Sequence, residues 1–540
     1  MEPNAYTDLV DWSRAQFALT AMYHWLFVPL TLGLGLLVAI METCYYRVRT
    51  ERWLTLTKFW MKLFGINFAV GVATGIILEF EFGTNWSNYS WFVGDIFGAP
   101  LAIEGIAAFF MESTFLALMF FGWKKLSPGA HLASTWLTVT GATLSAWWIL
   151  VANGWMQNPV GMEFNPDTVR HEMVSFADVA LNPVAVAKFI HVVTSSWSLG
   201  CVFVVGISCW VMLRRGAEDE VRRIVLRSVR TASAIGLAAT LLTAWTGHYS
   251  GTLMAKFQPM KLAAVEGLAK GGAGEDLVVA GLVNAGVDWT TASNDEAVDL
   301  QLSLPRGLSI MATGEVDGFV PGIRDVLEGY TDADGKAVPS AREKMARGRE
   351  AVKALSVYRK AKAAGDDATA EAARTALAAN VEYFGYGYIN DPAELVPNVP
   401  LLFYSFRVMV GCGCLFLALF GALTLFSRRI MENRPALWCM CLTLPLAWLA
   451  SETGWVVTEV GRQPWAIQDM LPNCAAVSAL QTGTVQTTFW IFAVLLTFVV
   501  QAVSYEFRVR RGNLLGSGTF SVLIPFVLAY IVWAWRVLDR

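Results

Sequence analysis

The chain has 540 residues, of which 55% are hydrophobic, 13% are aromatic and only 16% are charged. This is the composition of an integral membrane protein. The formal net charge of −3 does not suggest a nucleic-acid partner. The eight cysteines contain no Cys-x-x-Cys motif, which argues against a thiol metal site or a disulfide framework.

Nine apolar runs are long enough to cross about 30 Å of hydrocarbon at about 1.5 Å per residue. In chain order they cover residues 17–42, 58–82, 94–122, 131–155, 183–213, 229–250, 397–427, 434–458 and 485–507. A shorter run at 521–535 is a possible tenth helix. The N-terminal segment lacks the basic start of a cleaved signal, so we expect the first run to remain in the protein. The sequence therefore predicts an all-α membrane bundle of nine helices and a possible tenth.

Positive charge gathers in the short connections that follow the odd-numbered runs. Basic residues in such connections mark the cytoplasmic side of a membrane. The connections on the other side contain few cations, with Arg170 and Arg462 as the main exceptions. We therefore expect the N-terminus to face outward. The basic residues are Arg47, Arg49, Arg52, Lys124, Lys125, Arg214, Arg215, Arg222, Arg223, Arg227, Arg428, Arg429, Arg434, Arg508, Arg510 and Arg511.

The connection between the sixth and seventh runs is long and polar, and it would lie outside the membrane. Residues 341–379 within it are rich in Ala, Lys, Arg and Glu, which are good helix formers. We expect a hydrated, partly helical insertion there. The predicted regions are 1–250 for helices one to six, 251–396 for the outer loop, 397–510 for helices seven to nine and 511–540 for a C-terminal extension.

Three side chains inside apolar runs could bind a haem iron. His24, His191 and Met409 all lie near the expected outer ends of their helices. On neighbouring helices at one depth, His and Met can supply the two axial bonds of a six-coordinate haem iron, and Arg407 could then neutralise a propionate. Taken singly, each His is equally well a hydrogen-bonded helix residue, and Met is an ordinary packing residue.

Glu459 lies at the outer end of the eighth run, and Arg462 follows three residues later. A guanidinium beside a carboxylate suits either a plain ion pair or a site that holds a metal and propionates together. The sequence leaves both alternatives open.

Two further carboxyl groups, Glu104 and Glu112, lie within the third run among apolar residues. In a regular α-helix they would be about 12 Å apart along the axis and about 80° apart around it, too far for direct contact. Intramembrane carboxyl groups often belong to proton paths. We expect a water-bridged path, and the alternative is packing against polar groups of neighbouring helices.

Lys261 and Glu266 open the outer loop, close to the end of the sixth run. A charge pair in a loop is ordinarily solvated. Their position beside the membrane surface also suits a site where a lipid-soluble quinol is held by its hydroxyl groups and loses protons outward.

These residues belong to longer blocks by which the chain resembles subunit I of cytochrome bd quinol oxidases, from about residue 8 to residue 510. The outer loop is similar in length to that of the long-loop branch. The blocks are RAQFALTAMYHWLFVPLTLG, GVATGIILEFEFGTNWS, GDIFGAPLAIEGIAAFFMEST, VANGWMQNPVG, QPMKLAAVEG, FYSFRVMVG and GWVVTEVGRQPW.

The resemblance implies two haem b and one haem d. His191 and Met409 match the axial ligands of the low-spin haem b, with Arg407 near that haem. His24 matches the ligand of haem d, and Glu459 matches the ligand of the high-spin haem b. A variant with haem b in place of haem d stays open, because the same ligands could hold either macrocycle.

The resemblance also implies roles for residues around the haems. Trp455 matches an aromatic residue near the haems, and Arg462 matches a propionate partner. The matched residues of the proton path are Glu104 and Glu112, and those of the quinol-binding loop are Lys261 and Glu266. Where the family would have an acidic residue after Gly247, this chain has His248, so the family's local hydrogen bonding and proton release near the quinol loop are not carried over to this position.

The implied activity is electrogenic oxidation of quinol at the outer side and reduction of dioxygen to water with cytoplasmic protons, which generates proton motive force. The implied setting is a bacterial cytoplasmic membrane, with subunit II and a possible small single-helix subunit as partners and the lipid bilayer around them. An alternative is an ion-coupled transporter that uses Glu104 and Glu112 as proton sites. It gives no reason for four potential iron ligands at one depth.

Overall fold

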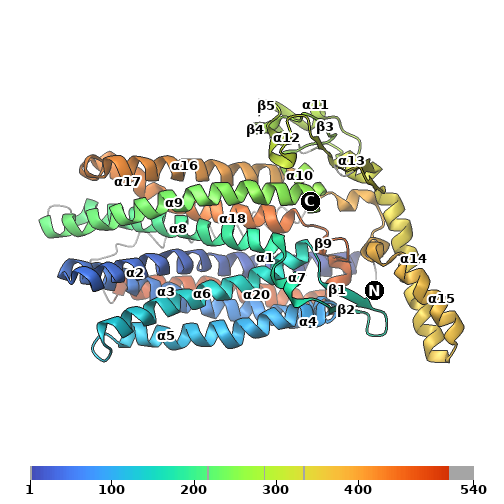
Figure 1. Ribbon diagram of the computed structural model, residues 1–540, viewed down its shortest axis with the longest axis horizontal. Coiled ribbons are helices and arrows are strands. Elements are labelled where there is room, and N and C mark those ends of the chain that lie inside the picture. The colour runs from blue at the N-terminus through green and yellow to red at the C-terminus, as the bar shows by residue number, and fades with distance from the viewer. Residues whose placement is uncertain (1–2, 216–217, 285, 333–334, 510–540) are drawn as a thin grey trace.

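Long helices lie side by side in an elongated bundle, and a smaller mixed region covers one end of it (Figure 1). The computed structural model describes residues 3–509, except 216–217, 285 and 333–334. The bundle consists of α1 (Pro3–Trp25), α2 (Val28–Val48), α3 (Glu51–Thr84), α4 (Ser87–Ile103), α5 (Phe110–Phe121), α6 (Pro128–Gln157), α8 (Pro183–Arg215), α9 (Asp219–Phe257), α16 (Val399–Glu432), α17 (Arg434–Leu442), α18 (Leu444–Val460) and α20 (Thr482–Val509).

Within the described residues, eight helical segments are long and apolar enough to cross a membrane. They correspond to the first eight predicted runs, and α20 adds a shorter apolar stretch, Thr482–Phe498, where the ninth was expected. The fold class, an all-α membrane bundle, is therefore confirmed. The run at 521–535 lies outside the described residues.

In three of the spanning segments, a break in the α-helical geometry lies close to a proline. The first is interrupted at 26–27, just before Pro29, and the eighth at Thr443, just before Pro445. In the third, Pro100 precedes a π-helix, η1 (Glu104–Phe109). Proline lacks an N–H and disrupts the helical hydrogen bonds before it. Because η1 begins at Glu104, the helix between Glu104 and Glu112 is not the regular α-helix that the sequence analysis assumed.

Glycines bring α2 and α8 into backbone contact. A Cβ atom on Gly33 would lie 2.1 Å from the Ser196 carbonyl oxygen, and one on Gly200 would lie 2.5 Å from the Gly33 carbonyl carbon. Gly154 of α6 approaches Ala185 of α8 in the same way. Lipid tails are as apolar as Leu, so close van der Waals packing is what holds such helices together. These contacts fix α8 against both α2 and α6.

The outer region between α9 and α16 combines short helices with two-stranded antiparallel ladders. The stretch predicted to be helical forms α14 (Ala341–Ala364) and α15 (Asp367–Ala378). The ladders pair β3 with β6, β4 with β5 and β7 with β8. The other elements are α10 (Pro259–Glu266), β3 (Gly272–Ala273), β4 (Leu277–Val283), α11 (Asn294–Ala297), β5 (Val298–Leu304), α12 (Gly307–Thr313), β6 (Phe319–Val320), α13 (Ile323–Glu328), β7 (Tyr330–Thr331), β8 (Ala337–Val338), η2 (Val381–Tyr388) and η3 (Pro392–Leu395).

Two smaller connections lie at the same end of the bundle as this region, and so does the N-terminus (Figure 1). The helix that was expected to end at residue 250 continues as α9 to Phe257, so the outer region begins later than predicted. The connections contain β1 (Met162–Asn165), β2 (Arg170–Met173), α7 (Phe176–Ala180), β9 (Trp465–Ile467), β10 (Leu471–Pro472) and α19 (Asn473–Ala476).

Candidate functional site

His24 is held by a threonine of the neighbouring helix α3. Its Nδ1 lies 2.9 Å from Thr74 Oγ1, and the Thr74 hydroxyl donates its hydrogen to the carbonyl of Gly71, 2.9 Å away. The threonine oxygen can therefore only accept, so His24 Nδ1 carries the ring proton and Nε2 keeps a free lone pair. His24 is the second-last residue of α1, just before the interruption that separates α1 from α2.

His191 is held in the same way between α8 and α9. Its Nδ1 lies 3.1 Å from Thr246 Oγ1, and that hydroxyl donates to the Leu242 carbonyl at 2.9 Å. His191 therefore also presents Nε2 as its free ring nitrogen. A histidine that binds a metal normally donates its other ring N–H to an acceptor, which fixes the tautomer and the ring orientation. Both histidines have this arrangement.

A glycine on a neighbouring helix lies against each of the three predicted ligands with nitrogen or sulfur. A Cβ on Gly75 would lie 3.0 Å from His24 Cε1, and one on Gly247 would lie 3.3 Å from His191 Cε1. A Cβ on Gly454 would lie 3.1 Å from Met409 Sδ. The missing side chains let each ligand lie close to a second helix backbone.

Trp455 of α18 connects the helices that carry the predicted ligands. Its ring is 4.8 Å from that of Trp25, the residue after His24, and Lys188 Nζ lies 5.8 Å from it. Lys188 is one turn before His191 on α8. On α18 itself, Trp455 follows Gly454, the residue that contacts Met409. The structure therefore brings the segments of His24, His191 and Met409 together around one indole ring.

Glu459 lies one turn beyond Trp455 and is fully hydrogen-bonded. Its Oε2 accepts from Arg462 Nη2 at 2.5 Å, and its Oε1 accepts from Asn153 Nδ2 at 2.9 Å. Lys188 Nζ donates to Asn153 Oδ1, so two cations and one carboxylate share this network. The arrangement is an ion pair, and Asn153 connects it to Lys188 of α8, one turn before His191.

Arg407 joins α16 to the outer region. Its guanidinium donates to the carbonyls of Val265 at 2.8 Å and Val278 at 2.7 Å, and its Nη2 lies 3.0 Å from Glu266 Oε2. Glu266 is 2% exposed, and its Oε1 has no hydrogen-bond partner among the described residues. Burial raises the pKa of Glu266, and the charge of Arg407 opposes that rise. Glu266 is therefore a buried acid with one free acceptor oxygen.

Lys261 is also buried, and the reading of Lys261 and Glu266 as a solvated charge pair is wrong. The Lys261 ammonium donates to Gln157 Oε1 at 2.7 Å, Gln258 Oε1 at 2.9 Å and the Thr458 carbonyl at 3.0 Å. Burial lowers the pKa of Lys261 well below its usual value. Lys261 and Glu266 are both on α10 but have different partners. The partners of Lys261 lie at the end of the bundle, and the partner of Glu266 is Arg407 on α16.

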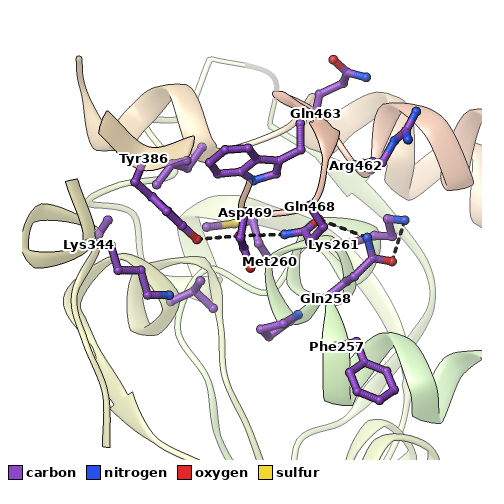
Figure 2. Close-up of a pocket in the computed structure, with 16 residues that line it drawn as sticks. Phe257, Gln258, Met260, Lys261, Lys344, Tyr386, Arg462, Gln463, Gln468 and Asp469 are labelled. Carbon is purple, nitrogen blue, oxygen red and sulfur yellow. Dashed lines mark hydrogen bonds between the residues drawn. The ribbon is translucent and has the colours of Figure 1, made fainter. Parts of the chain in front are cut away.

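A pocket borders Lys261 between α10, α14 and the connection that contains β9. Figure 2 shows a row of hydrogen bonds along it: Gln258 Nε2 donates to Gln468 Oε1 at 3.1 Å, and Gln468 Nε2 donates to Asp469 Oδ1 at 3.0 Å. Tyr386 donates to the same Asp469 oxygen at 2.6 Å. The row therefore has a cation at one end and a carboxylate at the other, next to an opening.

Glu104 and Glu112 both lie against α6. Ser145 Oγ donates to Glu104 Oε1 at 2.6 Å. A Cβ on Gly141 would lie 3.1 Å from Glu112 Cβ, so the two backbones are close there. Glu112 is 7% exposed. One face of α6 therefore contacts both predicted proton-path acids.

The donor set fits haem. In addition to the two free Nε2 atoms, Arg407 and Arg462 each have a buried Nε–H without a partner among the described residues. A buried guanidinium N–H without an acceptor is costly, and haem propionates are suitable acceptors. The carboxylate of Glu452, on α18, is likewise buried and has no hydrogen-bond partner among the residues that the structure describes.

Several of these residues were missed from the sequence. Lys188 and Glu452 are ionisable residues inside apolar runs, so the rule that flagged Glu104 and Glu112 applied to them equally. Asn153 gave no signal, because an amide is identified as a partner of Glu459 only by its position in space. His248 is exposed on α9, next to the Gly247 that contacts His191.

Comparisons with known proteins agree with this architecture. The family described as cytochrome bd terminal oxidase subunit I matches residues 12–511. Cytochrome bd-II ubiquinol oxidase subunit 1 of Escherichia coli strain K12 is 42% identical over 521 residues, which are 92% of this chain and 95% of that protein. Cytochrome bd ubiquinol oxidase subunit 1 of Bacillus subtilis strain 168 is 35% identical over 468 residues, which are 86% of this chain and 85% of that protein.

A solved structure gives independent support for the fold. The structure of bd oxidase from Geobacillus thermodenitrificans superposes with a TM-score of 0.71 at 21% identity and covers 99% of both chains. The family match extends over nearly the whole chain and includes every candidate site residue named above. The chain therefore belongs to the cytochrome bd terminal oxidase subunit I family.

Proposed function

We propose that this chain is the haem-binding subunit of a quinol oxidase that oxidises membrane quinol at the outer side and reduces dioxygen to water with cytoplasmic protons. Membership of the family makes it a subunit of a respiratory oxidoreductase in a membrane. Consuming protons on one side and releasing them on the other makes the reaction electrogenic, without a separate pump.

His191 and Met409 would hold the low-spin haem b through Nε2 and Sδ. His24 would hold haem d and Glu459 the high-spin haem b, with haem b in place of haem d as the alternative. Arg407 and Arg462 would bind propionates through their free Nε–H groups. Bound haem supplies one-electron transfer and an iron atom that binds dioxygen.

One observation carries this proposal. Both His24 and His191 have an Nδ1 proton fixed by a threonine that can only accept, so both present a free Nε2. A histidine that merely packs in a helix bundle has no need for this arrangement twice. An ion-coupled transporter gives no reason for it.

Quinol oxidation would take place at α10. Glu266 Oε1 has no partner among the described residues and could accept a hydrogen bond from a quinol hydroxyl, and burial, which raises the pKa of Glu266, favours its holding a proton. Lys261 would orient the ring from the pocket side, where the row from Gln258 to Asp469 begins (Figure 2). Proton uptake from the other side would pass Glu112 and Glu104.

The orientation and the partners follow from the same proposal. The N-terminus and the outer region would face the outside of a bacterial cytoplasmic membrane, with the basic connections inside. The relatives are named as subunit 1 of an oxidase, which implies a partner chain. We assign subunit II as that partner, with a small single-helix subunit as a possible addition.

Extraction and identification of the pigments of the purified complex test the proposal. We expect two haem b and one haem d for each copy of this chain. A ratio of three haem b would select the alternative without haem d. A correctly inserted complex that contains no porphyrin would overturn the proposal.

A further inference from the structure

A buried ion pair lies at the end of the bundle opposite to the outer region. His131 of α6 contacts Glu42 of α2 through Nδ1 and Oε1, 2.6 Å apart, and both side chains are 3% exposed. Thr135 donates to the other carboxylate oxygen at 2.6 Å, and His131 Nε2 lies 3.0 Å from the Met119 carbonyl of α5. Neither the predicted haem sites nor the predicted proton path includes this pair.

The hydrogen bonds determine how many protons the pair holds. The Met119 carbonyl can only accept, so His131 Nε2 must carry a hydrogen. The contact between Nδ1 and Oε1 requires one more proton, which sits on either atom. Removing that proton would leave two lone pairs facing each other and a buried, unpaired negative charge, which is costly. The pair is therefore electrically neutral with one shared proton.

An aromatic side chain covers the pair on the side of the short turn between α5 and α6. The Trp123 ring lies over the His131 ring, with centroids 3.9 Å apart. Lys58 of α3 places its ammonium 4.9 Å from the Trp123 ring. Glu42 and Lys58 are thus the charged groups that the described contacts bring to His131 from α2 and α3. Trp123 separates the pair from the exposed turn.

The face of α6 that starts at His131 leads to the two acids of the predicted proton path. Thr135, Thr138, Gly141 and Ser145 recur three or four residues apart, so they share that face. Gly141 contacts Glu112, and Ser145 donates to Glu104. Gly141 lies six positions after Thr135, which is about 9 Å along the helix axis. A short row of water molecules beside the threonine hydroxyls can bridge that distance.

We propose that Glu42 and His131 form the cytoplasmic proton-loading site that supplies Glu112 and then Glu104. This inference rests on the proposed function and its orientation. A proton from the cytoplasm binds the pair, which leaves Glu42 neutral beside a protonated His131. One proton then moves along α6 to the carboxylate of Glu112, and the pair returns to its neutral state. No electron moves in this step. Chains of Glu and His serve as proton relays in membrane proteins.

The rate of proton uptake tests the proposal, measured with a pH-sensitive dye during quinol-driven turnover of the whole complex in lipid vesicles. Glu42→Gln keeps the size and a hydrogen-bonding oxygen but cannot carry the proton. We expect proton uptake and oxygen consumption to fall at least tenfold, while the haem spectrum stays unchanged. The matched control is Thr43→Val, which removes the 3.1 Å hydrogen bond from Trp136 between the same two helices without removing a titratable group. We expect it to retain the wild-type rate.

The order of two variants at residue 42 distinguishes a relay from a purely structural contact. Glu42→Asp retains a titratable group but shortens the side chain, so a relay requires Asp to be faster than Gln. A purely structural role requires the Glu42→Gln variant to take up protons as fast as the Glu42→Asp variant, or faster. That order would overturn the proposal even if both variants were slower than the wild type. A wild-type complex without haem or oxygen consumption would instead contradict the proposed function.

Discussion

The tautomer and the ring orientation of a histidine that binds iron through Nε2 depend on the group that accepts a hydrogen bond from its Nδ1–H. In this chain the acceptors are Thr74 and Thr246, and the hydroxyl hydrogen of each is already given to the carbonyl of its own helix. The threonines therefore act as fixed acceptors rather than as interchangeable donors. Loss of the group that accepts this hydrogen bond typically lowers metal affinity by about 10–100-fold.

Thr246→Val should weaken the hold on the low-spin haem b, because it leaves the His191 Nδ1–H buried without an acceptor. We expect haem b to transfer to excess apomyoglobin about 10–100-fold faster than from the wild type. The matched control is Thr243→Val, one turn away, whose hydroxyl donates only to the Ala239 carbonyl at 2.8 Å. Equal transfer rates in the two variants would show that the Thr246 contact does not orient a ligand.

His171 is a buried histidine with a different role. It lies in β2 between the rings of Phe92 and Phe164, with centroids 4.9 and 5.3 Å away, and its Nδ1 has no partner among the described residues. Burial lowers its pKa from 6.5 to about 4. The neutral form is the one that fits, so its contribution to stability is present above about pH 6.5 and is lost as the pH falls toward 4.

The hairpin of β1 and β2 should therefore open more easily in acid. Between pH 7 and pH 5 the free energy of opening should fall by about 2 kcal/mol, since one unit of pKa shift corresponds to about 1.4 kcal/mol. Hydrogen exchange of residues 162–173, corrected for the intrinsic effect of pH, measures this change. In His171→Phe the dependence should disappear. A wild-type hairpin that is equally protected at both pH values would show that His171 is not what responds.

Residue types pointed to the candidate site residues, but not to the groups that those residues contact. His24, His191, Met409 and Glu459 stand out because polar or sulfur-containing side chains recur in apolar runs. The burial of Lys261 could not be predicted, because it depends on Gln157 and Thr458, which are distant in sequence. Contacts of this kind exist only after the bundle end and α10 have packed together.

Close contact between helices depends on small residues at few positions. Gly33 and Gly200 allow α2 and α8 to touch at their backbones, and α8 carries His191. Because the hydrophobic effect does not drive helices together inside lipid, the loss of such a contact is not compensated by burying a larger side chain.

Gly200→Leu should separate α2 from α8 and reduce assembly of the complex. We expect severalfold less assembled complex, with less haem per chain, measured by absorbance after size-exclusion chromatography. The control is Gly421→Leu on α16, where an added Cβ would meet nothing within 4 Å. Wild-type yield from Gly200→Leu would show that the close approach is not needed for assembly.

The sequence predicted where helices lie better than how regular they are. Apolar length located the spanning segments, since crossing hydrocarbon requires it. The π-helix at Glu104 was not predicted, because Pro100 signals a disturbance but not its form. The ladders of the outer region were not predicted, and the strands of two of them, β3 with β6 and β7 with β8, have only two residues each.

In the whole molecule, the two ends of the bundle differ in the number of basic residues in their short connections. The basic connections lie at one end, where Arg52 contacts Glu220 at 2.6 Å and Arg222 contacts Glu432. The N-terminus and the outer region lie at the other end (Figure 1). This distribution matches the rule that basic loops stay in the cytoplasm.

Single cysteines test the orientation. A membrane-impermeant maleimide applied to intact spheroplasts should label Glu371→Cys, on exposed α15, above the background of the native cysteines. It should label Lys125→Cys, in the turn between α5 and α6, only after the membrane is opened. The reverse pattern would contradict both the orientation and the direction of proton movement proposed here.

The central claim is that separate helices of one membrane bundle hold iron porphyrins through His, Met and Glu side chains. A reduced-minus-oxidised absorption spectrum of the wild-type complex beside Met409→Leu tests it most directly. Leucine preserves the packing volume but cannot bind iron, so we predict selective loss of the low-spin haem b bands and of quinol oxidation. An unchanged spectrum in Met409→Leu would contradict the claim for this ligand, and a wild type without haem bands would contradict the whole account.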